Sequence, residues 1–199
     1  MKIFRNNNAD GSGHVCPWWL AYSFDNPLRR WLHRPRKLLA PYVKEGMHVI
    51  DVGCGMGGFS IAMAKLVGDG GRVTALDLQE KMLEITRKRA KRAGMQHRIQ
   101  TIQGSADQLE GKAHIDFALT FWMVHEVPDR VGFFNKLYTV LKTDGMLLVA
   151  EPAMHVSRKG FEQTLQEAFE AGLRPHGQQP AVRLSLSKLL IKHREGVEL

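Results

Sequence analysis

The chain has 199 residues, the length of one domain, and its 44% hydrophobic residues are enough for a buried core. Its two cysteines, Cys16 and Cys54, are too few for a disulfide framework or a cysteine zinc site, and no basic-then-apolar leader opens the chain. We therefore expect a cytoplasmic protein without a metal site. The longest apolar run, at 147–150, is far too short for a membrane span. The net charge of +8 leaves nucleic acid open as a partner, although a solvated helix face explains the basic residues better.

The first 45 residues differ in character from the rest and are interpreted as an extension on a core of residues 46–199. They include a group of aromatic side chains and a short helix that is expected to start at Pro27, with Asn26 as its cap. Aromatic residues at this density are unusual in a free tail. We expect a lid formed by Trp18, Trp19, Tyr22 and Phe24, of which the first three are expected to line an acceptor pocket.

From residue 47 onward, short apolar runs alternate with segments in which apolar residues recur at helical spacing. This alternation predicts an α/β fold, a doubly wound and mostly parallel sheet with helices on both faces. Ligands bind to such sheets beyond the carboxyl ends of the strands. The predicted strands are 47–52, 72–76, 98–103, 115–121, 146–150 and 183–192, and the predicted helices are 59–67, 80–93, 129–141 and 161–169.

A glycine-rich loop follows the first predicted strand. Gly53, Gly55 and Gly58 satisfy G-x-G-x-x-G, a pattern that by itself also fits dinucleotide binding. Asp51 precedes the loop, where a carboxylate would repel a pyrophosphate but would attract the ammonium group of a methionine moiety. Asp77 ends the next strand and is placed to accept hydrogen bonds from ribose hydroxyls. The loop therefore predicts a nucleoside ligand and favours one with an amino acid attached.

These motifs, taken in order, resemble the class I S-adenosylmethionine-dependent methyltransferases, which have a Rossmann-like, seven-stranded sheet. The matching segments are 49–58, 75–83, 104–109, 116–129 and 141–152. The resemblance implies S-adenosyl-L-methionine as the cofactor. Ser105 stands where an aspartate is usual in that family. The implied cofactor-binding residues are Asp51, Gly53, Cys54, Gly55, Asp77, Leu78, Ser105, Ala106 and Phe121.

The acceptor side of the predicted site lies just past the fourth and fifth strands. His125 is the candidate general base, and Glu126, Glu151 and His155 are expected to border the same cavity. We interpret the chain as a methyltransferase for a small-molecule acceptor. An RNA-modifying methyltransferase, a nicotinamide-dependent oxidoreductase and a non-catalytic nucleotide-binding module remain the alternatives. The sequence leaves the acceptor and the oligomeric state undetermined.

Overall fold

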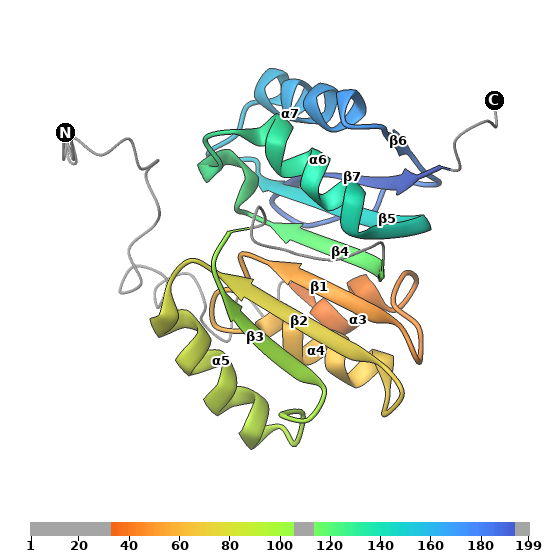
Figure 1. The fold of residues 1–199 in the computed structure, drawn as a ribbon. Coiled ribbons are helices and arrows are strands. Elements are labelled where there is room, and N and C mark those ends of the chain that lie inside the picture. Colours follow the sequence, from red (N-terminus) through yellow and green to blue (C-terminus); the bar gives the residue numbers. More distant parts are fainter. Residues whose placement is uncertain (1–32, 106–113, 194–199) are drawn as a thin grey trace, which may run out of the picture.

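A computed structural model describes residues 33–105 and 114–193, which form one seven-stranded sheet with helices on both faces (Figure 1). The strand order is β3-β2-β1-β4-β5-β7-β6, and β7 runs antiparallel to the other six strands. The predicted doubly wound fold is confirmed. The strands are β1 (His48–Val52), β2 (Arg72–Asp77), β3 (Ile99–Gln103), β4 (Ile115–Phe121), β5 (Leu141–Pro152), β6 (Leu173–Pro175) and β7 (Ser185–Lys192).

Side chains that alternate along the central strands build two separate cores, one on each face of the sheet. Val49 points to the face covered by α3 and α4, and Ile50 points to the face covered by α6 and α7. Because helices cover both faces of β1, its sequence is mostly apolar and does not alternate between apolar and polar residues. The helices are α3 (Pro35–Leu39), α4 (Gly58–Val67), α5 (Glu80–Arg92), the 3₁₀ turn η2 (Val124–Glu126), α6 (Arg130–Val140) and α7 (Arg158–Glu170).

Part of the predicted N-terminal extension packs on the sheet. Leu39 and Val43 are buried in the core on the face that α4 covers. The expected helix from Pro27 lies outside the described residues. No described helix has the length and apolar character needed to cross a membrane.

The fifth strand is longer than predicted because it contains the expected turn as a bulge. Asp144 has a φ of 63°, and the register with β4 shifts between Ile115 and Phe117. A side chain on Gly145 would lie 2.8 Å from the carbonyl oxygen of Lys142, so glycine is required at this close approach. With this bulge, the pairing of β5 with β4 extends back to Leu141, opposite Ile115.

Candidate active site

The order of the strands reverses between β1 and β4, and sheets of this kind bind ligands beyond the carboxyl ends of their strands at such a point. The loop after β1 and the segment after β4 leave these two adjacent strands on the same side. Met123 lies so close to Gly53 that a side chain at that glycine would approach its Cβ to 2.9 Å. The predicted cofactor loop and the predicted acceptor residues therefore lie side by side.

Gly55 lies at an open point of the glycine loop. Its φ is 53°, and a Cβ built at this position has no atom within 4 Å. Its N–H donates a hydrogen bond of 2.8 Å to the carboxylate of Asp77, which also accepts one from the N–H of Gln79. The backbone at Gly55 is therefore open to a ligand and lies beside the Asp77 carboxylate. A carboxylate in this position is suited to accept hydrogen bonds from ribose hydroxyls.

Asp51 and Cys54 are buried beneath the same loop. The hydroxyl of Ser60, in the first turn of α4, donates a hydrogen bond to the carboxylate of Asp51. Burial raises the pKa of Asp51 to about 7, and it raises the pKa of the Cys54 thiol well above its usual range. Cys54 is therefore an unreactive thiol that shapes the loop, whereas Asp51 changes charge near neutral pH.

The pKa of Asp51 gives a testable pH dependence of cofactor affinity. If the ionised carboxylate attracts the ammonium group of the cofactor, a protonated Asp51 must lose its proton on binding. We expect the affinity for S-adenosylhomocysteine to fall below pH 7, by up to about tenfold per pH unit. Calorimetry between pH 5.5 and 8 measures this effect, with Asp51→Asn as the pH-independent control. A constant wild-type affinity over this range would show that Asp51 does not face the ammonium group.

The remaining predicted cofactor residues differ in their exposure. Leu78 is 51% exposed at the end of β2, and Ser105 is partly buried after β3. The ring of Phe121, in contrast, packs against Phe59 at 4.3 Å between centroids and is only 6% exposed. Phe121 therefore packs within the core, and its ring is not exposed at the strand ends. Ala106 lies outside the described residues, as do Trp18, Trp19 and Tyr22.

On the acceptor side, Glu151 at the end of β5 holds His125 by a hydrogen bond to Nδ1. The Glu151 carboxylate is 1% exposed, and its other oxygen accepts a 2.9 Å hydrogen bond from the N–H of Val124. Glu151 was expected to border the acceptor cavity, but both of its oxygens face the η2 turn. It therefore orients the imidazole and does not lie open to an acceptor.

The outer nitrogen of His125 lies on the side away from Glu151. Nε2 lies 3.9 Å from the carboxylate of Glu126, and the His125 side chain is 31% exposed. The hydrogen bond that Nδ1 donates to Glu151, together with the charges of Glu151 and Glu126, raises the pKa of His125 above its ordinary value. The ring of His155 lies nearly parallel to that of His125, with 6.5 Å between the centroids. A half-exposed imidazole held by a buried carboxylate is suited to accept a proton at Nε2.

Trp122 and Ser185 also lie at these strand ends, and no pattern in the sequence pointed to either of them. Trp122 has a φ of 62°, which is rare for a bulky residue, and its indole N–H donates a 2.7 Å hydrogen bond to the Ser185 hydroxyl. Ser185 reaches the edge because β7 is antiparallel to β5 and begins opposite Pro152. Positive φ is usually signalled by glycine, so a tryptophan in this conformation could not be foreseen.

The fold and this site define a class of protein. Residues 43–183 match the family described as a methyltransferase domain, so the chain belongs to that family. A structure of a methyltransferase dependent on S-adenosylmethionine from Aquifex aeolicus superposes with a TM-score of 0.78 at 24% identity, covering 89% of this chain and 100% of that one. At this identity, the likeness shows the fold.

Curated relatives share part of the sequence. A demethylmenaquinone methyltransferase from Listeria welshimeri is 34% identical over 119 residues, which are 59% of this chain and 49% of that protein. The enzyme of the same name from Staphylococcus carnosus is 31% identical over 167 residues, 81% of this chain and 64% of that protein. The chain thus spans about half to two thirds of the length of these relatives.

Proposed function

We propose that this chain transfers a methyl group from S-adenosylmethionine to a small-molecule acceptor with an ionisable hydroxyl group, such as the reduced form of a quinone. The observation that carries the proposal is the His125–Glu151 pair, in which Glu151 lies at the end of β5 and His125 follows β4, next to the open glycine loop. The name of the relatives, demethylmenaquinone methyltransferases, supports a quinone as the acceptor class.

The glycine loop and the end of β2 would hold the cofactor. Asp77 offers its remaining carboxylate lone pairs to the ribose hydroxyls, and Leu78 offers exposed apolar surface to the adenine. Ser105 and Ala106 would border the adenine, and Asp51 would face the ammonium group. When bound, the cofactor supplies a methyl group on a sulfonium, an electrophile with a good leaving group.

His125 would supply the base that a hydroxyl acceptor needs. Its Nε2 takes the hydroxyl proton while Glu151 keeps the Nδ1 proton in place. The electron pair of the broken O–H bond would stay on the acceptor as a phenolate, and the phenolate oxygen, or the ring carbon beside it that shares the charge, would form the new bond to the methyl carbon. Attack by carbon would be followed by loss of that carbon's own proton to solvent. The carbon–sulfur bond of the cofactor would break with its electrons kept by sulfur, which leaves a neutral thioether. His125 then carries the proton and returns it to solvent. Glu126 would stabilise the imidazolium by its charge.

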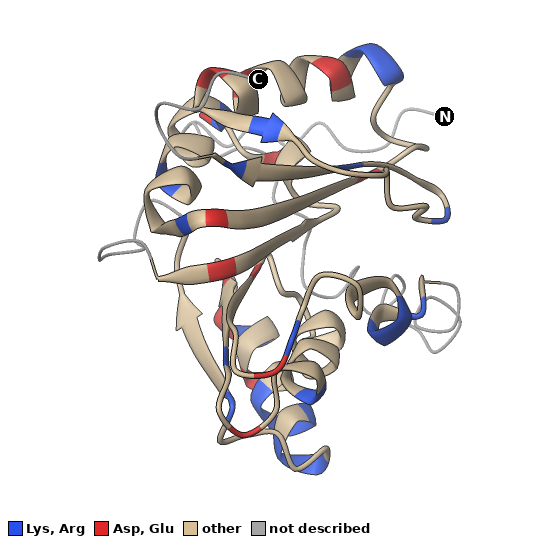
Figure 2. Ribbon diagram, turned by 90° about the vertical axis from the view of Figure 1, so that its right-hand side faces the viewer, with Lys and Arg blue, Asp and Glu red and all other residues tan. Residues whose placement is uncertain are grey.

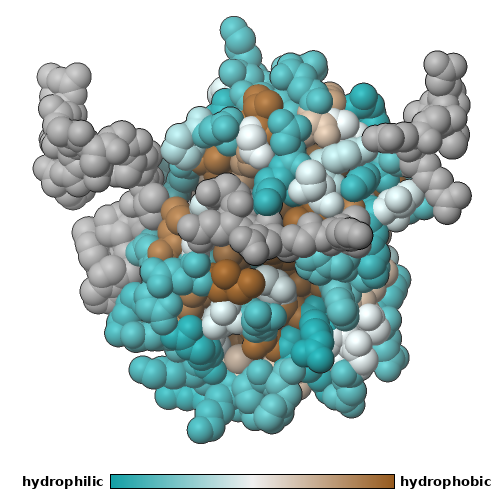
Figure 3. Space-filling view, viewed as in Figure 1, coloured by the Kyte–Doolittle hydropathy of each residue, from teal (hydrophilic) through white to brown (hydrophobic). Residues whose placement is uncertain are grey.

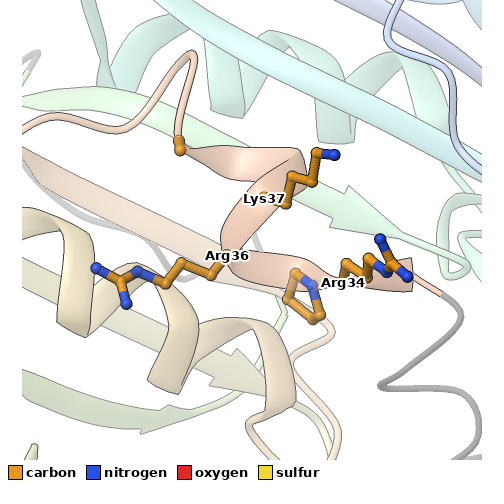
Figure 4. A pocket seen from close by; sticks show the side chains of 5 residues that line it. Arg34, Arg36 and Lys37 are labelled. Atoms are coloured by element: carbon orange, nitrogen blue, oxygen red, sulfur yellow. The ribbon is translucent and has the colours of Figure 1, made fainter.

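An RNA acceptor is less well supported. Figure 2 shows that Lys and Arg residues are spread over several helices and loops. A shallow hollow beside α3 is lined by Arg34, Arg36 and Lys37, but the three side chains point in different directions (Figure 4). They do not converge on one phosphate. The expected aromatic lid and a cytoplasmic location remain part of the proposal.

A methyl-transfer assay with labelled cofactor tests this function. We expect the chain to label reduced demethylmenaquinone and to leave the oxidised quinone unlabelled, because only the reduced form has hydroxyl protons for His125 to accept. Total cellular RNA, treated in the same way, should stay unlabelled. Labelled RNA with unlabelled quinol would replace the proposal by the RNA alternative, and tighter binding of NAD than of S-adenosylhomocysteine would replace it by an oxidoreductase.

A further inference from the structure

The exposed large hydrophobic side chains lie on one side of the molecule, at the carboxyl ends of the parallel strands. In residues 33–105 and 114–193 there are four, and all of them lie where the parallel strands end. Leu78 directly follows β2, Val131 is in the first turn of α6, Met154 follows β5, and Leu184 precedes the antiparallel β7. In the view of Figure 3, hydrophilic residues cover most of the surface that is not grey. Exposed apolar groups confined to one edge indicate a contact surface.

Met154 and Leu184 belong to neighbouring segments, one after β5 and one before β7. Met154 is 83% exposed and Leu184 is 55% exposed, and the N–H of Ala153 donates a 3.0 Å hydrogen bond to the carbonyl oxygen of Leu184. Leu184 has a φ of 58°, a conformation that disfavours leucine and is better suited to asparagine or glycine. Neither the exposure nor the conformation of Leu184 stabilises the fold. A contact with another molecule would account for a leucine at this position.

Positively charged side chains flank this apolar pair. Arg158 and Lys159 begin α7, and Arg183 precedes Leu184; all three are exposed. The first turn of α7 contains no acidic residue, although the positive end of a helix dipole favours acidic rather than basic side chains. Segments 153–160 and 181–186, named here the docking edge, contain no Asp or Glu.

We propose that the docking edge binds the surface of an anionic lipid bilayer, with Met154 and Leu184 inserted among the acyl chains and the three cations at the headgroups. Apolar side chains with adjacent cations are the combination that binds peripheral proteins to such surfaces. RNA would engage the cations alone and would leave the exposure of Met154 and Leu184 without a role. The candidate site lies at the same carboxyl ends of the parallel strands, but the proposal does not depend on which acceptor is methylated.

Sedimentation with vesicles tests the proposal without cofactor or acceptor, so its result is separate from that of the methyl-transfer assay. The probes are vesicles of 30% phosphatidylglycerol in phosphatidylcholine, and of phosphatidylcholine alone. We expect binding to the anionic vesicles at 0.1 M salt, about fivefold weaker for each cation removed and strongly reduced at 0.5 M salt. Binding to the neutral vesicles should be at least tenfold weaker.

Two double variants and a control locate the surface. Met154→Gln with Leu184→Asn removes the apolar groups, and asparagine tolerates the positive φ, so the fold should be retained. Arg158→Gln with Lys159→Gln removes two cations from a position where they oppose the helix dipole. Each pair should weaken vesicle binding by at least tenfold. The control is Lys65→Gln, which replaces an exposed lysine in the last turn of α4, outside the docking edge. It should change vesicle binding less than twofold.

Three results would overturn the proposal. The first is no sedimentation with anionic vesicles at 0.1 M salt. The second is equal weakening by Lys65→Gln and by the Arg158–Lys159 pair, which would indicate nonspecific charge. The third is an unchanged affinity of the Met154–Leu184 variant, with circular dichroism showing that it is folded. If vesicles do not bind but RNA does, and the Arg158–Lys159 pair weakens that binding, the edge is an RNA surface.

Discussion

Replacing His125 by alanine is expected to lower methyl transfer to a hydroxyl acceptor by about 10²–10⁴-fold, the usual contribution of a general base. The affinity for S-adenosylhomocysteine should stay within about twofold, because the imidazole lies on the η2 turn after β4 and makes its hydrogen bond to Glu151, not to the glycine loop. Steady-state kinetics with reduced demethylmenaquinone and calorimetry with S-adenosylhomocysteine measure the two quantities.

His155→Ala is the matched control, since it removes the neighbouring, exposed imidazole and leaves the His125–Glu151 pair intact. It should change turnover by less than threefold. Parallel loss of turnover and of cofactor affinity in His125→Ala would place His125 in the cofactor pocket and contradict the proposed role.

The pH profile separates a base from a merely structural histidine. His125 must be neutral to accept a proton, so turnover should rise as pH increases through its pKa, which the Glu151 hydrogen bond raises above the ordinary value. Glu151→Gln keeps a hydrogen-bond acceptor but removes the charge, and it should therefore move the rise in turnover to lower pH. A profile that does not move would mean that Glu151 does not tune the catalytic base.

Substituting Gly55 tests where the cofactor binds. Gly55→Val should reduce the affinity for S-adenosylhomocysteine by more than a hundredfold, because the new side chain would fill the open space beside Asp77. The positive φ adds about 1–2 kcal/mol of backbone strain, so the variant should remain folded in a domain of ordinary stability. Calorimetry and thermal unfolding measure the two effects.

Gly94 provides a matched control for the strain. It ends α5, its φ is 70°, and a Cβ there would also meet no atom within 4 Å. Gly94→Val should lower the stability by a similar amount and leave cofactor affinity unchanged. If both variants bind S-adenosylhomocysteine normally, the cofactor does not lie against Gly55.

The order of the elements was predictable because it depends on local patterns. Apolar runs buried on both faces gave β1 and β4, and helical periodicity gave α5 and α6 to within a few residues. The glycine spacing and the acidic residues at the strand ends are local features of the sequence. The candidate residues of the cofactor side could therefore be proposed from the sequence. The three-residue strand β6 and the five-residue helix α3 were missed because they are too short to show a period.

The sequence by itself determined the class of fold, the glycine loop and the expectation that His125 lies on the acceptor side. Only the tertiary structure decided what holds His125, because Glu151 is 26 residues away in the chain and meets it through the pairing of β4 with β5. The contact of Trp122 with Ser185 across 63 residues, and the exposed edge formed by Met154 and Leu184, likewise arise from the antiparallel return of β7. Local periodicity reports which side of a strand is buried, whereas register and strand direction result from long-range pairing. The residues that meet beyond the strand ends are therefore set by the sheet as a whole.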